Sequence, residues 1–340
     1  MVKREIICEY QQLMLRPPVA PEQLYQQAVR NDNPTIEAWR DIWVKNIQTN
    51  HARFGSFKEH GLGNLFGKYR YMPVIIAGSG PSLKFNAHEL KERGGVPLVS
   101  CLHNFHYFED MGVAPDYYVS LDAGPLAVDE VASEGGEHDA DYYWGLTKNR
   151  TLIAFIGTDP KLFEKWQGKV YLYNAMIPDA AYQEASDKLE LFHTWVSNGG
   201  NVLGACLYIS KAIFGASTIA FVGADFSFGY DKKFHSWDSK YDAKMGVVSY
   251  MFDIYGHKVA TWPSYSNFKA WFDFICMRVP GDWVNCSEGG CLGSYADGNL
   301  ASLKYMDLRD YLSGLNMCDK VKAQCIDPAC EGDAGKTLLF

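Results

Sequence analysis

The sequence predicts an α/β protein in which strands and helices alternate along the chain. From residue 73 onward, short apolar runs are separated by longer segments in which apolar residues recur at helical spacing. This alternation is typical of βαβ units, and near-continuous apolar runs are typical of strands buried on both faces of a parallel sheet. The first run ends in a glycine turn, Gly78-Ser79-Gly80. Together these observations predict a doubly wound, mostly parallel, Rossmann-like sheet with a helical N-terminal extension.

The predicted elements follow one another in chain order. The expected strands are residues 73–77, 97–102, 117–121, 151–156, 169–173, 218–223 and 283–286. The expected helices are residues 82–93, 104–111, 160–166, 180–192, 201–214 and 266–278. Residues 226–250 are polar and aromatic with little periodicity, so we expect a long functional loop or lid there.

Residues 1–70 are predicted to form the helical extension. Helices are expected at 21–28 and 34–48, and the second carries Ile36, Trp39, Ile42, Trp43 and Ile47 at helical spacing. The extension is expected to act as a cap or as a surface for homo-oligomerisation. Residues 71–315 are the predicted α/β domain, and residues 316–340 are expected to be a loosely ordered tail.

The composition and charge exclude several classes of protein. The 340 residues are 47% hydrophobic and 14% aromatic, which is typical of a folded globular chain. A formal net charge of −8 argues against nucleic-acid binding through bulk electrostatics. The first residues are too charged for a signal peptide, and no run of eighteen uncharged apolar residues occurs. We therefore expect a cytoplasmic protein without a membrane span.

The nine cysteines are predicted to be free thiols in a reducing compartment. They include no CxxC pair, and Cys101, Cys206 and Cys276 lie in apolar runs, where a cysteine acts as a small buried hydrophobe. Three more, Cys318, Cys325 and Cys330, lie near the C-terminus at spacings that match no standard zinc site.

The glycine turn after the first strand is a candidate anion site. Residues Gly78, Ser79, Gly80, Pro81 and Ser82 join the strand to a helix start, where free N–H groups favour a phosphate. The alternative is a turn needed only for tight packing of strand against helix. A dinucleotide role is disfavoured, because Leu83 stands where a third glycine belongs and the next strand ends without an acidic residue.

Further polar residues follow other predicted strands. Asn104 follows the second strand, Asp122 the third, and Gly223 and Asp225 the sixth, so all should meet at one edge of the sheet. A second candidate anion site, with Asn198, Gly200 and Asn201, opens the helix at 201–214. Each of these residues could instead be only a helix cap. The late Gly335-Lys336-Thr337 is rejected as a phosphate loop, because no strand precedes it.

Several ordered motifs resemble one superfamily. PVIIAGSGPSL at 73–83, GVAPDYYVSLD at 112–122 and the long segment 199–226 are similar to the MptE-like superfamily. It comprises archaeal 6-hydroxymethylpterin diphosphokinases and bacterial motility accessory factors (Maf proteins), which glycosylate flagellin. The Trp43…Asn46…Asn50 pattern and NCSEGG at 285–290 resemble the Maf members more closely.

A fainter resemblance is to bacterial sialyltransferases that use CMP-sialic acid. The shared features are the AGxGPSL turn, Asn104 followed by YFED at 107–110, and a strand ending in GxDF. That resemblance implies that Asn104 and residues 78–82 contact the nucleotide and that His257, after Gly256, is the base. Ser79 departs from the usual Asn of the turn, and Ser227 replaces a tyrosine for which Tyr230 could substitute.

The resemblance implies a nucleotide-dependent transferase, with sugar transfer as the leading hypothesis. A CMP-linked, nonulosonic-type sugar donor would bind at the glycine turn, at Asn104, Asp122 and Gly223, and at the helix start near Asn201. The acceptor would be a hydroxyl of a protein or glycan. The candidate catalytic residues are His257 first, His235 in the predicted lid second, and Asp225.

Two alternatives remain open from the sequence. One is transfer of diphosphate from ATP to a pterin alcohol, which requires Mg²⁺, and Asp122 and Asp225 are then the candidate metal ligands. The other is a non-catalytic nucleotide-binding or assembly protein that kept the fold, with which Ser79 is compatible.

Overall fold

A computed structural model describes residues 22–55, 59–132, 136–189, 195–237, 248–296 and 298–315. In these residues the main sheet has nine strands in the order β13-β10-β7-β1-β2-β3-β4-β5-β6, and every neighbouring pair is parallel. The bounds are β1 Pro73–Ala77, β2 Leu98–Cys101, β3 Tyr117–Ser120, β4 Thr151–Phe155, β5 Lys169–Ala175, β6 Trp195–Val196, β7 Thr218–Val222, β10 Asp282–Asn285 and β13 Leu303–Tyr305.

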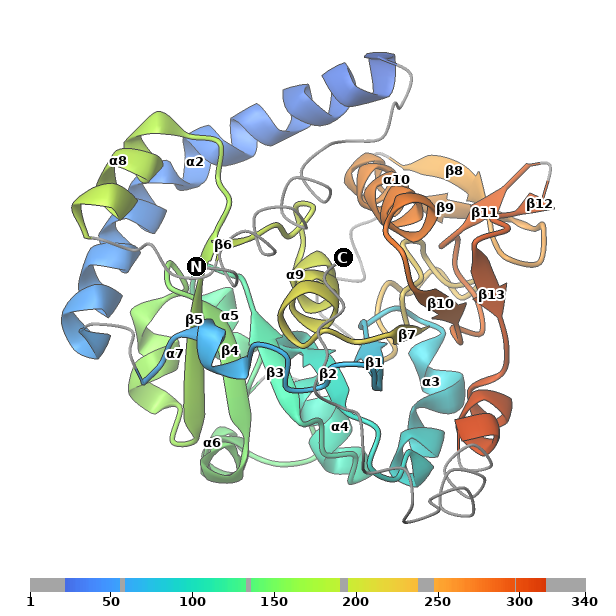
Figure 1. Ribbon diagram of the computed structural model, residues 1–340, viewed down its shortest axis with the longest axis horizontal. Coiled ribbons are helices and arrows are strands. Elements are labelled where there is room, and N and C mark those ends of the chain that lie inside the picture. Colours follow the sequence, from blue (N-terminus) through green and yellow to red (C-terminus); the bar gives the residue numbers. More distant parts are fainter. Residues whose placement is uncertain are drawn as a thin grey trace, which may run out of the picture.

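The helices connect these strands and cover the sheet. They are α2 Glu22–Phe54, α3 Leu83–Asn86, α4 Phe105–Met111, α5 Leu126–Asp129, α6 Ala140–Leu146, α7 Pro160–Lys165, α8 Ala180–Lys188, α9 Val202–Tyr208 and α10 Pro263–Arg278. Two small antiparallel sheets, β8 Ser249–Phe252 with β9 Lys258–Thr261 and β11 Ser294–Tyr295 with β12 Gly298–Asn299, lie beside α10 (Figure 1).

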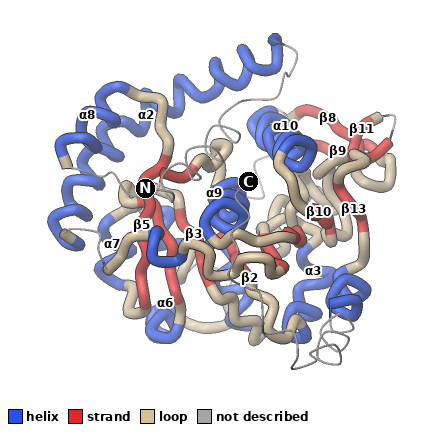
Figure 2. The backbone as a smooth tube through the Cα atoms, in the orientation of Figure 1, coloured by secondary structure: helices blue, strands red, loops and turns tan. Residues whose placement is uncertain are grey.

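The strand order makes the sheet doubly wound. The chain adds β2 to β6 on one side of β1 and then returns to place β7 on the other side. Right-handed crossovers therefore bring the helices before and after this reversal to opposite faces. In Figure 1, α4 and α6 lie below the central strands, α9 and α10 lie above them, and Figure 2 shows the same layers by element type. Helix α9 packs on β1, β2 and β3.

The predicted fold class is confirmed, and the seven predicted strands are all present within two residues of their expected ends. The strands at both edges of the main sheet, β6 and β13, were missed because they are only two and three residues long. The expected helix at 82–93 is shorter. It ends at Asn86 (φ −127°), whose side chain donates to the Cys286 carbonyl, and continues as a 3₁₀ segment.

The N-terminal extension differs from the prediction in one respect. A single helix, α2, runs through Pro34 where two helices were expected. It packs against α7, α8 and α10, and in Figure 1 it lies alongside α8. Asn46 Nδ2 donates to the Ala123 and Gly157 carbonyls at 2.9 Å each, so the helix is fixed to the loops that follow β3 and β4.

The interior is apolar, and five cysteines belong to it. Cys101, Cys206, Cys276, Cys286 and Cys291 are buried free thiols, which agrees with the prediction for the first three. The expected C-terminal tail at 316–340, with its three cysteines, lies outside the described residues. None of the helices in the described part of the chain is both long and apolar enough to cross a membrane.

A buried ion pair fixes α10 to the small sheets. Lys269 Nζ lies 2.6 Å from Asp273 Oδ2, and both side chains are almost fully buried. The Tyr295 hydroxyl donates to Asp273 Oδ2 at 2.6 Å, and the Gly293 N–H donates to Oδ1 at 2.8 Å. Asp273 thus accepts from Lys269 on α10 and from two groups at β11, so the buried charges are paired and α10 is joined to the β11 segment.

Replacing Asn50 by Ala is expected to destabilise the fold by about 2–4 kcal/mol, because it leaves two buried carbonyls without a donor. Asn50 is fully buried, and Nδ2 donates to the Ile156 and Thr158 carbonyls at 2.7 and 2.8 Å. Urea unfolding measures the change, and Thr49→Ala is the matched control, since Thr49 is exposed and bonds only to Lys45 on the same helix. Equal stability of the two variants would contradict this anchoring role.

Candidate functional site

The predicted site residues meet at the carboxyl edge of the sheet. Because every pair in the main sheet is parallel, the ends of β7, β1, β2 and β3 lie side by side in that order. The segments that follow them contain Gly223 to Asp225, Gly78 to Ser82, Asn104 and Asp122, respectively. The winding reverses between β7 and β1, and ligands of doubly wound sheets bind at such a point.

The glycine turn after β1 packs against the turn after β7. Gly78 N donates to the Val222 carbonyl and Gly80 N to the Gly223 carbonyl, both at 2.9 Å. A Cβ atom on Gly78 would lie 2.4 Å from the Gly223 oxygen, so only glycine permits this approach. The N–H groups of both glycines thus bond to the protein itself, which agrees with the alternative of a turn needed for tight packing.

Asp225 completes this contact. Its Oδ2 accepts from the Ser82 N–H at 2.7 Å and its Oδ1 from the Ser82 hydroxyl at 2.5 Å. Burial raises the pKa of Asp225 to about 6, and the two bonds from Ser82 oppose that rise. The carboxylate therefore fastens β7 to the start of α3, and both of its oxygens are engaged there.

Asn104 lies between β1 and β2 at their ends. It is fully buried, and its Nδ2 donates to the Gly78 carbonyl and to the Ser100 hydroxyl, both at 3.0 Å. Its Oδ1 is buried and has no partner among the described residues. A buried carbonyl oxygen without a donor is uncommon, and such an atom beside a ligand crevice is available to a bound group.

Asp122 belongs to a titratable cluster that the sequence did not reveal. Its carboxyl hydrogen-bonds Glu130, the residue after α5, and His103 Nδ1 lies 3.3 Å from Glu130 Oε1. Burial, and next the neighbouring Glu130, raise the pKa of Asp122 to about 7. Burial raises the pKa of Glu130 to about 8, although the hydrogen bond with Asp122 opposes that rise. Glu130 was missed because it lies eight residues beyond Asp122 without a motif.

His235 lies against this cluster and is a weak base. Its ring stacks on His103 at a centroid distance of 4.6 Å and on Trp237 at 5.3 Å. Burial, followed by the nearby His103 and His106, lowers the pKa of His235 to about 3. The imidazole is thus neutral at physiological pH and has little tendency to accept a proton, which counts against its predicted catalytic role.

The two carboxylates proposed as magnesium ligands do not fit one ion. Asp225 follows β7 and Asp122 follows β3, which are three strand spacings apart, or about 14 Å. A magnesium ion binds oxygens at about 2 Å, so these two cannot ligate it together. Within the described residues, no three His, Cys, Asp or Glu side chains are arranged to hold a metal.

The second predicted anion site caps α9 and touches α10. Asn201 Oδ1 accepts from the Gly204 N–H at 2.9 Å, and Asn198 Oδ1 accepts from the Gly200 N–H at 2.9 Å. Gly200 has φ +88°, and a Cβ there would meet the Phe268 ring at 2.7 Å. Asn201 Nδ2 is buried without a partner among the described residues, so this donor, like Asn104 Oδ1, is available to a ligand.

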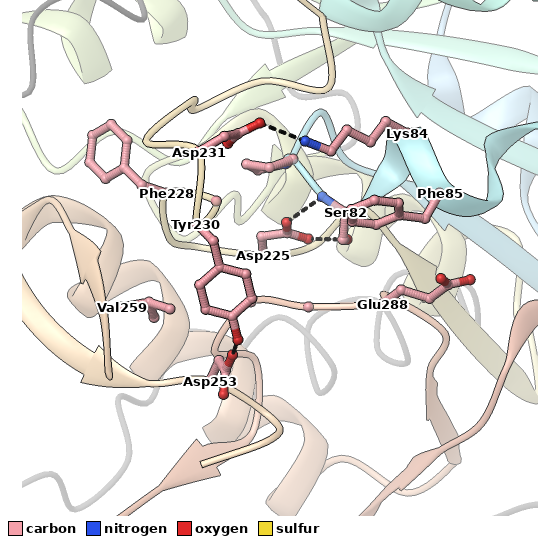
Figure 3. Close-up of a pocket in the computed structure, with 14 residues that line it drawn as sticks. Ser82, Lys84, Phe85, Asp225, Phe228, Tyr230, Asp231, Asp253, Val259 and Glu288 are labelled. Carbon is pink, nitrogen blue, oxygen red and sulfur yellow. Dashed lines mark hydrogen bonds and ion pairs between the residues drawn. The ribbon is translucent and has the colours of Figure 1, made fainter. Parts of the chain in front are cut away.

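A pocket of about 190 Å³ opens beside the contact between β1 and β7 (Figure 3). Four chain segments form it: the start of α3, the loop after β7, the β8–β9 hairpin and the loop after β10. The lining residues are Pro81, Ser82, Lys84, Phe85, Asp225, Phe228, Gly229, Tyr230, Asp231, Asp253, Val259, Glu288, Gly289 and Gly290. Its position beside the reversal of winding makes it the candidate substrate pocket.

His257 lies at the rim of this pocket on the β8–β9 hairpin. Its Nδ1 is 2.8 Å from the Tyr230 hydroxyl, which donates to Asp253, and 3.7 Å from Asp253 Oδ2. Asp253 is buried and also accepts from the Tyr255 and His257 N–H groups at 3.0 and 2.8 Å. The sequence did not single out Asp253, because no strand was predicted between residues 250 and 266 and no motif includes it.

The fold and this edge define a doubly wound α/β protein of the class that binds its ligand at the carboxyl ends of parallel strands. Residues 45–231, more than half of the chain, match the family described as "6-hydroxymethylpterin diphosphokinase MptE-like". The chain therefore belongs to the MptE-like family, as the motifs predicted. No curated protein matches it.

A solved structure supports the same fold. The Maf glycosyltransferase from Magnetospirillum magneticum AMB-1 aligns with a TM-score of 0.50 and 17% sequence identity. The alignment covers 75% of this chain and 37% of that one, so the chain spans little more than a third of that protein's length. At this identity the likeness concerns the fold. The fainter similarity to sialyltransferases is not addressed by either match and stays a prediction.

Glu130→Gln is expected to remove a pH dependence of stability. The pKa of Glu130 rises from 4.5 to about 8 on folding, so the folded state holds the proton more tightly than the unfolded state. The free energy of unfolding therefore falls as pH rises across that window. The amide of glutamine does not ionise in this range. The variant should therefore be more stable than the parent by about 1–3 kcal/mol at pH 8, and the two should have nearly equal free energies of unfolding at pH 4.

Urea unfolding between pH 4 and pH 8 measures this difference. Glu137→Gln is the matched control, because Glu137 is exposed. If the free energies of unfolding of Glu130→Gln and the parent differ by the same amount at every pH, the pKa of Glu130 does not rise on folding.

Proposed function

We propose that this chain is a nucleotide-dependent transferase that moves a sugar from a nucleotide-linked donor to a hydroxyl acceptor, with His257 as the general base. The observation that carries the proposal is the hydrogen-bonded unit of His257, Tyr230 and the buried Asp253 at the mouth of the pocket. Membership of a family described by a transfer reaction agrees with it.

The geometry suits His257 to remove a proton. Asp253 is buried and held by two backbone N–H groups, so its position beside the imidazole is fixed. The His257 side chain is 67% exposed, which leaves Nε2 open to an incoming hydroxyl. A base placed in this way contributes about 10²–10⁴-fold to the rate.

The donor nucleotide is proposed to lie along the strand ends from Asn104 towards Asn201. Asn104 is fully buried and Asn201 is partly exposed, and each has one buried polar atom without a described partner, an acceptor on Asn104 and a donor on Asn201. A nucleotide offers both kinds of partner. Asp122 and Gly223 border this stretch of the edge at β3 and β7.

Diphosphate transfer from ATP to a pterin alcohol is the second candidate, because the family's description names that reaction. It needs a magnesium ion bridging the phosphates, and the pair predicted to hold it cannot do so jointly. Metal dependence therefore separates the two enzymes. A non-catalytic nucleotide-binding protein would bind a nucleotide and show neither activity.

Binding of CMP without a metal is the expected result of a nucleotide screen. Isothermal titration and thermal unfolding with CMP, UDP, GDP and ATP, each with and without Mg²⁺, measure it. A nucleotide at 100 times its Kd adds about 2.7 kcal/mol of stability, which is readily detected. Binding of ATP that depends on Mg²⁺ would favour the diphosphokinase, and no binding at all would leave the non-enzymatic alternative.

His257→Gln is expected to lower kcat for donor turnover by about 10²–10⁴-fold and to leave the affinity for the nucleotide unchanged. His138→Gln is the matched control, since His138 is exposed and lies before α6, away from the pocket. Initial rates of nucleotide release together with titration of the nucleotide separate the two effects. A kcat within a few-fold of the parent would rule out His257 as the base.

A further inference from the structure

Four of the 14 residues that line the pocket in Figure 3 are acidic. Asp225, Asp231, Asp253 and Glu288 contribute acidic groups, whereas Lys84 is the one cation among its described lining residues. Phosphate and carboxylate ligands of proteins are normally met by arginine, lysine or free N–H groups. The charged groups in the walls of this pocket are instead mainly negative, like an anionic ligand itself.

The single lysine is already neutralised. Lys84 Nζ lies 2.7 Å from Asp231 Oδ2, and both side chains are about one-third exposed at the pocket's edge. The Lys233 N–H donates to the other oxygen of Asp231 at 3.1 Å, which holds the carboxylate in place. An anion that entered the pocket would therefore have to compete with Asp231 for the charge of Lys84.

The remaining carboxyl groups are constrained in the same place. Asp225 bonds Ser82 and Asp253 bonds Tyr230, so neither can turn away from an entering group. Burial, and next Glu89 and Asp307, raise the pKa of Glu288, which shows that the field beside the pocket is already negative. Adding a further negative charge to this field is unfavourable.

The size and the aromatic lining limit the ligand further. The pocket has a volume of about 190 Å³, below the roughly 300–1,000 Å³ of pockets that hold drug-sized ligands. A volume of this size suits a single ring better than a whole nucleotide-linked donor. Phe85, Phe228 and Tyr230 provide apolar faces on which a single ring can lie.

We propose that this pocket binds the acceptor as a neutral group of one ring that carries hydroxyl or amino donors, and that its carboxylates exclude anions. Carboxylate oxygens accept from O–H and N–H donors, and the aromatic side chains cover the ring faces. A sugar ring and a pterin both have this chemistry. That the bound group is the acceptor of a transfer rests on the proposed function, whereas the selection of neutral ligands over anions does not.

Ligand-detected saturation-transfer NMR with matched probes tests the proposal. The probes are glucose, N-acetylglucosamine and 6-hydroxymethylpterin, each compared with its phosphate ester. We expect at least one neutral probe to bind the full chain and its ester to bind at least tenfold more weakly. The neutral probe that binds identifies the source, a sugar or a pterin.

Gly289→Leu locates the binding in the pocket. Gly289 lines the pocket, has no positive φ, and a Cβ there would lie 3.5 Å from Ser82 Cβ, an ordinary contact. The leucine side chain should fill the cavity and abolish binding of the neutral probe. Gly145→Leu on α6 is the matched control, because a Cβ there meets nothing within 4 Å and Gly145 does not line the pocket.

Asp231→Asn tests the selection by charge. The amide keeps the shape and the bond from Lys233 but releases Lys84 from its ion pair. We expect the affinity for the phosphate ester, relative to that for the neutral probe, to rise about tenfold. Thermal unfolding of each variant confirms that it is folded.

Three results would overturn the proposal: equal binding of an ester and its neutral parent, retention of the neutral probe by Gly289→Leu, or no binding of any neutral probe. These outcomes are separate from those of the nucleotide screen. If no nucleotide binds but the neutral probe still binds more tightly than its ester, the pocket selects its ligand by charge as proposed and the transferase function is wrong.

Discussion

The contact between the ends of β1 and β7 determines how the carboxyl edge of this sheet is used. Cβ atoms on Gly78 and Gly80 would lie 2.4 Å from the Gly223 oxygen and 2.6 Å from Asp225 Cγ, so the two turns can touch only because both residues are glycines. Asp225 then bonds the Ser82 N–H and hydroxyl at the start of α3. The pocket wall, the direction of α3 and the loop towards Tyr230 all begin from this contact.

One consequence is that the glycine turn has a different role from the phosphate cradle that its sequence suggests. A cradle needs N–H groups that are free, and those of Gly78, Gly80 and Ser82 donate to the end of β7 and to the loop after it. Close packing and anion binding both require glycine, so the sequence pattern alone cannot distinguish them. The partner of each N–H comes from a segment about 140 residues away, which only the fold brings near.

The sheet and the edge position of Asn104, Asp122 and Asp225 were predictable, because apolar runs define strands and parallel strands end on one side. The partners of these residues were not. Glu130 beside Asp122 and Asp253 beside His257 are acidic residues in short connecting segments, with no spacing that marks them. Their chemistry arises from burial and from neighbours in space, and neither can be read from local pattern.

The two sides of the carboxyl edge differ in the charge of their side chains. On the side of β7 and β10, carboxylates and aromatic rings surround a small cavity in which Lys84 is paired, so a neutral group is favoured there. Towards β2 and α9, the buried Asn104 oxygen and Asn201 nitrogen have no partner among the described residues. Under the proposed function, the donor would use these two atoms and the acceptor would lie in the pocket, where His257 at its rim would take the hydroxyl proton. The glycine turn follows β1, between β7 and β2, so it lies between these two positions along the edge.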